Sequence, residues 1–547
     1  MKNILITLLM LGAGTNAMAT DSPISCPTVT LSGTLSNRIL DKDTTYLLSG
    51  CVSVPSGVTI TAQAGVVIMG EKSTNGTLVF RKGSTFTSQG TSSLPVIFTS
   101  NQVQANRNPG DWGGIIFEGD APNNNSNSIS LSNRTCNPVS GGGSNASDNS
   151  GTLKYMRIEL AEYGLTLISV GSGTEMHDIQ IAYSSQDGLQ LLGGTVNFKR
   201  LAFFNNYGSD ILATQGNQSK AQGIVSLRVD NNAHLASTDV SSIVIKNNDN
   251  APSYASASFS NTHPIFSNVT LIGPKYCVGS PDAEFKYGIL MLNNAEGEIY
   301  NSYIDGWRYG FYLDGSQVLA SANASSGATI QFAYNSLNNN ITADYGNSGT
   351  WPSGCATSMT QWLSGTGLAC RQRGIEIGNA AAYSSLCTSS PSFGLSSSGI
   401  DDPDFDDVPV LANDEFFVAT DNRGAFDATA WTTSWTNWAT LQEDFCPINK
   451  KMAPTGIANG ANNANSIALA PNPADGMTYA MFTTAQSGSV QVTVTNSVGQ
   501  VVRTITQDLG KDNQRIAIPT SGLSAGMYMV NVALQQGSIA RTKLIVK

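Results

Sequence analysis

The stretch that decides the fold is residues 162–215, EYGLTLISVGSGTEMHDIQIAYSSQDGLQLLGGTVNFKRLAFFNNYGSDILATQ. Gly164-Leu165 recurs as Gly188-Leu189 after 24 positions, and Asp210-Ile211 follows after a further 22. The repeats are short apolar runs separated by Gly, Asn and Asp, which is the pattern of short strands between turns. The stretch therefore predicts a structure that repeats a short set of strands every 22 to 24 residues.

The same period returns farther along the chain. Tyr287-Gly288-Ile289 recurs as Tyr309-Gly310-Phe311, again 22 positions later. A parallel β-helix has this period, because each coil stacks its strands on the coil below and the inward Val, Ile, Leu and Phe form one continuous core. A β-propeller needs roughly 40 or more residues per blade, and a leucine-rich repeat needs its Leu/Asn signature. The fold class is therefore predicted to be all-β, with a parallel β-helix.

Composition limits the partners. Only 12% of the residues are charged, about half the usual share, and the net charge is −10. Such a chain lacks the basic patches that nucleic acids and anionic membrane surfaces require. Low charge and 54 glycines, with many Asn, Ser and Thr, favour strands and loops over helices. We therefore predict no nucleic-acid partner.

The repeat also predicts the domain layout. The β-helix should occupy residues 51–447, and residues 20–50 should form an N-terminal cap that shields the first strand edges. Residues 122–150 and 316–400 are long and rich in Asn, Ser or Gly, so we expect them to leave the helix as loops, where binding residues tend to lie. A second cap is expected around residues 422–446. That segment contains Trp431, Trp435 and Trp438.

Residues 466–547, which follow a linker at residues 448–465, have the pattern of a small β-sandwich. Val490, Val492 and Val494 alternate with polar residues, as in half-buried strands. The segment resembles the C-terminal sorting domain of cargo exported by the type IX secretion system of Bacteroidetes. The resemblance is carried by Pro471, Asn472, Pro473, Gly499, Gly526, Tyr528, Lys543 and Lys547. It implies that the type IX machinery is a partner, that cleavage occurs in the linker, and that the protein is then released or attached to the surface.

The N-terminus is predicted to be a secretory signal peptide, residues 1–19. Lys2 precedes an apolar run from Ile4 to Leu11, and Ala17-Met18-Ala19 is a small-x-small cleavage site ending at Ala19. The apolar run is too short to span a bilayer, and we predict no transmembrane segment elsewhere. The protein is thus expected to pass through the periplasm to the cell surface or the medium.

The central region has a second resemblance. Residues 109–116, residues 149–159 and Arg423-Gly424-Ala425-Phe426 are similar to segments of a large group of secreted Bacteroidetes proteins of unassigned function. The resemblance spans about residues 30–445. It implies a right-handed parallel β-helix and an extracellular location, but no activity.

Eight cysteines lie after the signal peptide, and none lies in the sorting domain. An even number in an exported chain indicates disulfides. We predict that Cys26 pairs with Cys51 and Cys355 with Cys370, because each pair closes a short local loop. Such a bridge contributes about 3 kcal/mol if it is unstrained.

Two aspartates are candidates for catalysis. Asp187 and Asp210 lie 23 positions apart, about one coil, and could stack on adjacent coils at about 5 Å. Carboxylates so placed could bind calcium, or act as nucleophile and acid in a retaining glycosidase. The alternative is that each caps a turn through hydrogen bonds to the backbone.

An acidic run could bind a metal. Five aspartates fall within residues 401–407, and such a density of carboxylates needs a cation or solvent to screen it. Calcium prefers oxygen ligands, although the run lacks the spacing and the glycine of an EF-hand. The predicted calcium ligands are Asp401, Asp402, Asp404 and Asp406; a solvated loop is the alternative.

Aromatic residues suggest the function. Tyr300, Tyr303, Trp307, Tyr309 and Tyr312 lie within a dozen residues, where rings on the face of a solenoid could stack on sugars. We predict that Tyr303, Trp307 and Tyr309 contact a polysaccharide or surface glycan, although β-helix cores also contain such rings. The predicted function is a non-catalytic extracellular protein for adhesion or glycan binding.

An enzyme is the alternative function. A polysaccharide lyase or glycoside hydrolase could share this scaffold, but the sequence contains no Gly-His-Gly or Arg-x-Lys element and no serine-nucleophile signature. The three histidines, at 177, 234 and 263, have no catalytic-looking sequence neighbours. An exposed acidic pair beside Arg or Lys would favour the enzyme, and aligned aromatic rings on a flat face would favour binding.

Overall fold

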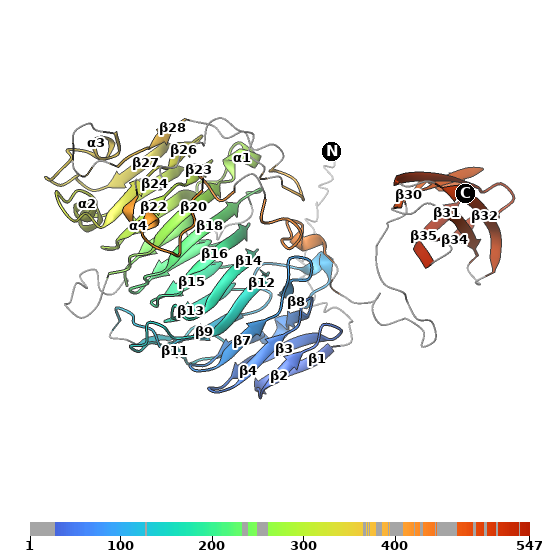
Figure 1. Cartoon of the computed structure of the whole chain (residues 1–547), viewed down its shortest axis with the longest axis horizontal. Helices are drawn as coiled ribbons and strands as arrows, with labels where there is room; N and C mark the ends of the chain where they lie inside the picture. Colours follow the sequence, from blue (N-terminus) through green and yellow to red (C-terminus); the bar gives the residue numbers. More distant parts are fainter. Residues whose placement is uncertain are drawn as a thin grey trace, which may run out of the picture. The chain divides into compact units, whose positions relative to one another are not determined.

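The computed structural model describes residues 28–125, 128–231, 239–248, 261–364, 368, 370, 372–378, 386–391, 393, 408–420, 422–426, 430–443, 445, 468–484, 488–496, 500–509, 512–534 and 537–547. The chain divides into two compact units, Met1–Lys450 and Lys451–Lys547, and each is described by itself (Figure 1). The signal peptide with Ala19, the linker, Cys26, Gly499 and the acidic run of residues 401–407 lie outside the described residues.

The larger unit is a parallel β-helix, as predicted. The register of the strands divides its coils into three parallel sheets, here named A, B and C in the order in which the chain visits them. Figure 1 shows the strands stacked from β1 (Thr28–Thr34) to β28 (Glu376–Ile377). Several long strands bend at a corner. The first half of such a strand belongs to sheet C, and its second half belongs to sheet A of the next coil. Sheet A contains β1 (Thr28–Thr34), β3 (Thr45–Val54), β5 (Val67–Gly70), β8 (Val96–Ser100), β12 (Gly151–Glu159), β14 (Glu175–Ala182), β16 (Phe198–Phe204), β18 (Lys220–Leu227), β20 (Ile265–Ile272), β23 (Tyr303–Asp305), β26 (Ser336–Asn338) and β28 (Glu376–Ile377).

Sheets B and C complete each coil. Sheet B continues from the ends of β1 and β3 through β6 (Thr77–Phe80), β9 (Gly114–Glu118), β13 (Leu165–Ile168), β15 (Leu189–Leu192), β17 (Ile211–Thr214), β19 (Val240–Lys246), β21 (Phe285–Leu292), β24 (Tyr309–Asp314) and β27 (Ala343–Ser348). Sheet C contains β2 (Arg38–Leu40), β4 (Thr59–Ala62), β7 (Thr85–Ser88), the first halves of β12, β14, β16, β18 and β20, then β22 (Gly297–Tyr300) and β25 (Ile330–Ala333). Two short 3-10 turns, η1 (Lys72–Thr74) and η2 (Gln104–Asn106), lie between strands.

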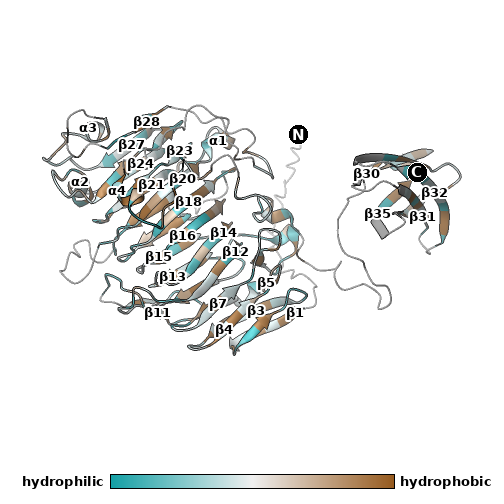
Figure 2. Cartoon of the chain, viewed as in Figure 1, coloured by the Kyte–Doolittle hydropathy of each residue, from teal (hydrophilic) through white to brown (hydrophobic). Residues whose placement is uncertain are grey.

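The register of sheet B matches the period read from the sequence. Leu165 pairs with Leu189, and Leu189 pairs with Ile211. In a later coil Ile289 pairs with Phe311. All of these side chains point inward and are fully buried. The repeat thus marks one inward position that is stacked from coil to coil into the core. Along the strands in Figure 2, hydrophobic and hydrophilic residues form bands.

The recurring glycine has a steric cause. A Cβ on Gly188 would lie 2.9 Å from the carbonyl oxygen of Asp210, and one on Gly310 would lie 2.6 Å from that of Asp344. In some coils Asp replaces this glycine. The side chain of an Asn four residues earlier then donates a hydrogen bond to the Asp carboxylate, as Asn206 does to Asp210 at 2.9 Å. Asp210 therefore belongs to the internal structure of the coil.

The two ends of the helix differ from the prediction. Residues 28–50, expected to be a cap, form the first coil itself, because β1 pairs with β3. At the other end α2 (Ser316–Ala322) and α3 (Met359–Ser364) insert Leu319 and Trp362 into the main core. Part of the segment 316–400, expected to leave the helix as a loop, therefore adds a coil through β25, β26 and β27, and α2 and α3 close the core. The predicted Cys355–Cys370 disulfide lies in this closure.

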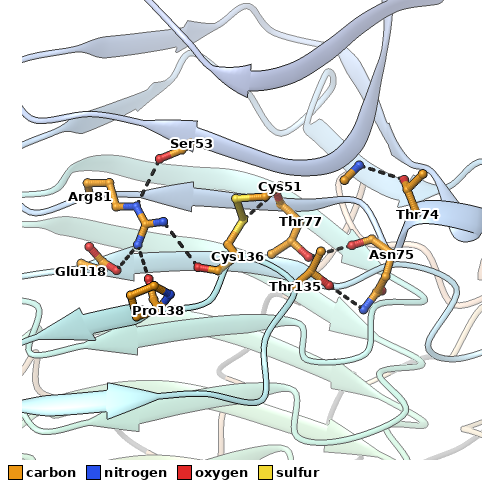
Figure 3. The surroundings of a disulfide bond; sticks show 11 residues. Cys51, Ser53, Thr74, Asn75, Thr77, Arg81, Glu118, Thr135, Cys136 and Pro138 are labelled. Atoms are coloured by element: carbon orange, nitrogen blue, oxygen red, sulfur yellow. Dashed lines mark hydrogen bonds and ion pairs between the residues drawn. A yellow bond between two sulfur atoms is a disulfide. The ribbon is translucent and has the colours of Figure 1, made fainter.

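The segment 122–150 folds back onto the helix. Its hairpin, β10 (Ile129–Leu131) and β11 (Val139–Gly141), is antiparallel and packs on the outside of sheet B. Cys136 of this hairpin forms a disulfide with Cys51, 85 positions earlier, so the predicted Cys26–Cys51 pairing is wrong (Figure 3). Arg81 donates beside this bridge to Glu118 at 2.7 Å and to the carbonyl of Pro138 at 2.8 Å. Burial of Ile129 and Val139 against sheet B explains why the long-range partner is chosen.

The described residues of the segment 408–445, here called the strap, cover the outside of sheets A and C. Leu411 and Phe417 pack with Tyr300 of sheet C, and Trp435 packs with residues of sheet A. It contains α4 (Pro409–Ala412) and η3 (Thr440–Gln442). Gln180 and Gln222 each exchange two hydrogen bonds with its backbone, and Trp435 and Trp438 pack in the same cluster as Phe204 of β16. The tryptophans predicted to form an end cap therefore cover a side of the helix. A third disulfide joins Cys277 of α1 (Lys275–Val278) to Cys387.

The smaller unit is an antiparallel β-sandwich, as predicted. Its strands are β29 (Ala468–Asp475), β30 (Met477–Thr484), β31 (Gly488–Thr495), β32 (Val501–Leu509), β33 (Asp512–Pro519), β34 (Gly526–Leu534) and β35 (Gly537–Val546). Val490, Val492 and Val494 are fully buried, as their alternation predicts. Asn472 clamps the last strand, because its side chain donates to the carbonyl of Lys543 and accepts from the N–H of Ile545, both at 2.8 Å. Within the described ranges no helix is long and apolar enough to cross a membrane.

Candidate functional site

The structure separates the three aromatic residues predicted to bind a glycan. Tyr303 and Trp307 are 0% exposed, and the hydroxyl of Tyr303 donates to Asp305 at 2.7 Å. Neither side chain can contact a ligand, so these two predictions are wrong. Tyr309 is half-buried at the surface. It lies at the corner where sheet B begins, two residues before the inward Phe311. Period-two alternation in short strands directs about half of such a cluster into the core.

Tyr309 belongs to an aromatic surface on sheet B. We define the tyrosine face as the outer side of β17, β19, β21 and β24. Its half-buried residues include Leu212, Val244, Tyr287, Leu290, Leu292, Tyr309 and Tyr312 and, at its edge, the charged Lys246 and Asp314. Leu212, Val244, Leu290 and Tyr312 are successive register partners and therefore form one row across four strands. At the usual strand spacing this row is about 14 Å long.

The three tyrosine rings of this face touch one another. Ring centroids lie 5.8 Å apart for Tyr287 and Tyr309, 4.8 Å for Tyr287 and Tyr312, and 5.1 Å for Tyr309 and Tyr312. The next register partner of Tyr312 is Gly346, where a Cβ would lie only 2.9 Å from the Tyr312 ring. Glycine at this position thus lets the ring lie across the neighbouring strand. The result is a continuous aromatic surface from two adjacent coils.

The hydroxyls of Tyr287 and Tyr312 stay protonated over the physiological pH range. Burial, followed by repulsion from Tyr312, Asp239 and Asp314, raises the pKa of Tyr287 to about 12. Burial also raises the pKa of Tyr312. The face therefore offers ring surfaces with neutral hydroxyls, which can donate and accept hydrogen bonds.

The hairpin of residues 129–141 closes one end of the tyrosine face. Arg134 lies over the ring of Tyr163 at 3.4 Å and donates to Gln190 at 2.8 Å. Gln190 is the register partner of Leu212, the first residue of the row. The hairpin therefore covers the apolar outside of sheet B up to Gln190. It does not cover the strands from Leu212 onward.

Asp187 and Asp210 do not form the predicted carboxylate pair. The local register is 22, so Asp187 lies opposite Ser209, whose N–H donates to its carboxylate at 3.0 Å. Asp210 is 1% exposed and forms a buried ion pair with Arg228 at 3.0 Å. The two aspartates lie 23 positions apart, one more than the register of 22. They are therefore not register partners, and a shift of one residue places a side chain on the other side of the sheet. Asp187 accepts from the backbone N–H of Ser209, as the alternative interpretation predicted. Asp210 instead accepts from side chains, those of Asn206, Ser226 and Arg228.

Sheet C carries a charged cluster that the sequence did not reveal. His177 contacts Asp178 at 2.6 Å and Glu175 at 3.1 Å, and Arg200 donates to both oxygens of Asp178 at 2.7 Å. Although burial opposes ionisation, these bonds hold the pKa of Asp178 below its usual value. Lys199, the register partner of His177, lies over the ring of Phe416, and burial followed by repulsion from Arg200 lowers its pKa.

A second charged cluster lies farther along sheet C. His263 contacts Glu296 at 3.2 Å and Glu298 at 2.9 Å, and Tyr300 donates to Glu298 at 2.6 Å. Although burial opposes protonation, these carboxylates raise the pKa of His263 to about 9. The imidazole is therefore charged at neutral pH and bridges two carboxylates. The partners lie 33 and 35 positions away, outside any local motif, so sequence reasoning missed them.

The calcium prediction stays untested by the structure. Asp401, Asp402, Asp404 and Asp406 lie outside the described residues. Among the residues that are described, no group of three or more His, Cys, Asp or Glu side chains is arranged to hold a metal ion.

One residue of the tyrosine face could have been found from the sequence. Tyr287-Gly288 and Tyr309-Gly310 are the repeat that predicted the fold, so both tyrosines must occupy the same position in adjacent coils. Because Tyr309 was taken as a surface residue, the repeat indicated Tyr287 as well. The burial of Trp307 could not be deduced in this way.

Comparisons with known proteins agree with the two units. Residues 33–374 match a family described as pectate-lyase like beta helix domain, and residues 468–547 match one described as secretion system C-terminal sorting domain. The sorting domain indicates export, with secretion or attachment to the cell surface. No curated protein matches the chain.

Solved structures give only a loose likeness. Full-length tailspike protein 2 of an Escherichia coli O157:H7 bacteriophage is 9% identical with a TM-score of 0.25, covering 92% of this chain and 65% of that chain. The enzymatically active domain of bacteriophage CBA120 tailspike protein 2 is 10% identical with a TM-score of 0.25, covering 92% and 72%.

Proposed function

The chain belongs to the pectate-lyase-like β-helix family, and we propose that it is an exported protein that binds polysaccharide or surface glycan without cleaving it. The observation that carries the proposal is the tyrosine face, where Tyr287, Tyr309 and Tyr312 join across two coils. Aromatic rings pack against the C–H faces of sugars, and phenol hydroxyls bond the sugar hydroxyls. The rigid, stacked sheet beneath them costs little ordering free energy on binding.

Export supports this proposal. The sorting domain delivers the β-helix to the outside of the cell, where polysaccharides are the abundant polymers. Three disulfides cross-link the described part of the β-helix, which suits an extracellular protein. A non-catalytic adhesion or glycan-binding role needs no residue beyond the tyrosine face.

Affinity electrophoresis of residues 20–447 in gels that contain single polysaccharides tests the proposal. We expect at least one polymer to retard the wild type, and the triple variant Tyr287→Ala, Tyr309→Ala, Tyr312→Ala to migrate as in a polymer-free gel. Tyr207→Ala, a half-buried tyrosine elsewhere on the coil, is the matched control and should be retarded like the wild type. Retardation of the triple variant equal to that of the wild type contradicts the proposal.

A polysaccharide lyase is the second candidate function. It is favoured by Lys199, whose lowered pKa and position beside His177 and Arg200 suit a proton-abstracting base on sheet C. Incubation with uronate polymers, read as new unsaturated sugar ends, tests this candidate. Turnover that disappears in Lys199→Met would replace the non-catalytic proposal with the enzyme.

A further inference from the structure

We infer that the tyrosine face selects uncharged sugar polymers and rejects polyuronates and other acidic glycans. This inference rests on the proposed function and names the ligand class of the same site.

The row through the middle of the face carries no charge. It consists of Leu212, Val244, Leu290 and Tyr312, which are register partners on successive strands. A polymer lying on this row would lose water from every group that contacts it. Burying a carboxylate against such side chains is costly without a cation to pair with it, whereas a neutral sugar ring loses only hydroxyl solvation.

Two of the cations next to the face lie near carboxylates of the chain itself, and a third contacts a backbone carbonyl. Lys286 forms an ion pair with Asp239 at 2.7 Å. Lys246 lies near enough to Asp187 to favour its ionised form. Arg308, beside Tyr309, points to the loop before β21 and lies 3.5 Å from the carbonyl of Asp282.

The anions next to the face would repel acidic ligands. Asp314 raises the pKa of Tyr287 by repulsion, which places its negative charge close to the rings; Asp239 acts in the same direction, although Lys286 partly neutralises it. Asp314 is held in place by a hydrogen bond from the Ser348 hydroxyl. A second carboxylate brought by the ligand would meet these charges in a partly desolvated site, where they are only weakly screened.

The two ligand classes can be compared on one polymer backbone. Fully methyl-esterified homogalacturonan and its de-esterified form share one backbone and differ in the carboxylate charge and its methyl group, and a neutral β-glucan is an uncharged probe without methyl esters. We expect the wild type to bind at least one uncharged polymer at least about tenfold more tightly than the de-esterified form. This binding should change less than about twofold when salt is raised from about 0.05 to about 0.5 M, because no ion pair contributes to it.

A charge variant makes the inference specific to this face. Leu212→Lys with Val244→Lys adds two cations to the neutral row at half-exposed positions, and we expect it to gain salt-sensitive binding of the de-esterified polymer. Leu212→Gln with Val244→Gln is the uncharged control and should not gain it. Circular dichroism and the melting temperature verify that each variant is folded.

The outcomes separate the inference from the proposed function. Binding of the de-esterified polymer by the wild type as tightly as its methyl ester, lost in the triple tyrosine variant, overturns the inference and leaves glycan binding standing. Failure of every polymer to bind overturns the proposed function itself, and the inference with it. Binding of uncharged polymers only, lost in the triple variant, supports both.

Discussion

Raising the pH from 6 to 10 should remove a specific part of the stability of the β-helix, through His263. Its imidazole bridges Glu296 and Glu298, and its pKa rises from 6.5 to about 9 in the folded chain. Because the folded pKa is the higher one, the stabilisation is fully present below about pH 6.5 and is lost as the pH rises through about 9. A shift of this size corresponds to about 3 kcal/mol, an upper bound for a bridge that is one-fifth exposed.

Chemical denaturation of wild type and His263→Gln at several pH values measures this contribution. The difference in unfolding free energy should be largest near pH 6 and should shrink by about 2–3 kcal/mol by pH 10, because the variant has no imidazole to titrate. Taking the difference cancels the titration of tyrosines and lysines, which both proteins share. Glu298→Gln should shift the loss to lower pH. A difference that is constant from pH 6 to 10 would refute the reasoning.

Three further predictions concern the parts that hold the site in place. Cys136→Ser opens an 85-residue loop and releases the hairpin. It should lower the unfolding free energy by about 3–5 kcal/mol in a denaturant titration. Unchanged stability would show that the hairpin does not depend on the disulfide. Asp210→Ala leaves Arg228 buried without its carboxylate and should cost about 3–5 kcal/mol. Asp187→Ala, which removes two hydrogen bonds at a half-buried position, should cost less, about 1–2 kcal/mol. Equal costs would contradict the structural assignment. Trp435→Ala should cost about 3–5 kcal/mol if the strap packs as part of the core, and a melting temperature equal to that of wild type would show that the strap is dispensable.

The repeat made the fold predictable, because the same inward position recurs in every coil. Leu165, Leu189 and Ile211 had to be equivalent, and the register of sheet B pairs them. The repeat does not fix on which side of the sheet each side chain lies, because a shift of one residue in the register reverses the side. Asp187 and Asp210 were misplaced by one position, and Trp307 was assigned to the surface although it lies in the core.

Long-range packing was not predictable from local patterns. The hairpin with Cys136, the strap with Trp435 and the helix with Trp362 each cover apolar surface far away in the sequence. Short loops are favoured entropically, which suggested Cys26 as the partner of Cys51, but burial of the hairpin against sheet B outweighs that preference. The bridge of His263 to Glu296 and Glu298 likewise needs two neighbouring coils that no local motif relates.

The central claim is that the glycan lies on the tyrosine face, and hydroxyl-radical footprinting of tyrosines tests it most directly. The wild type would be oxidised with and without the polymer that retards it, and modification of each tyrosine read by peptide mass spectrometry. The account predicts protection of Tyr287, Tyr309 and Tyr312 by the polymer, with Tyr207 unchanged. Equal oxidation of the three tyrosines in the presence of a bound polymer would contradict it.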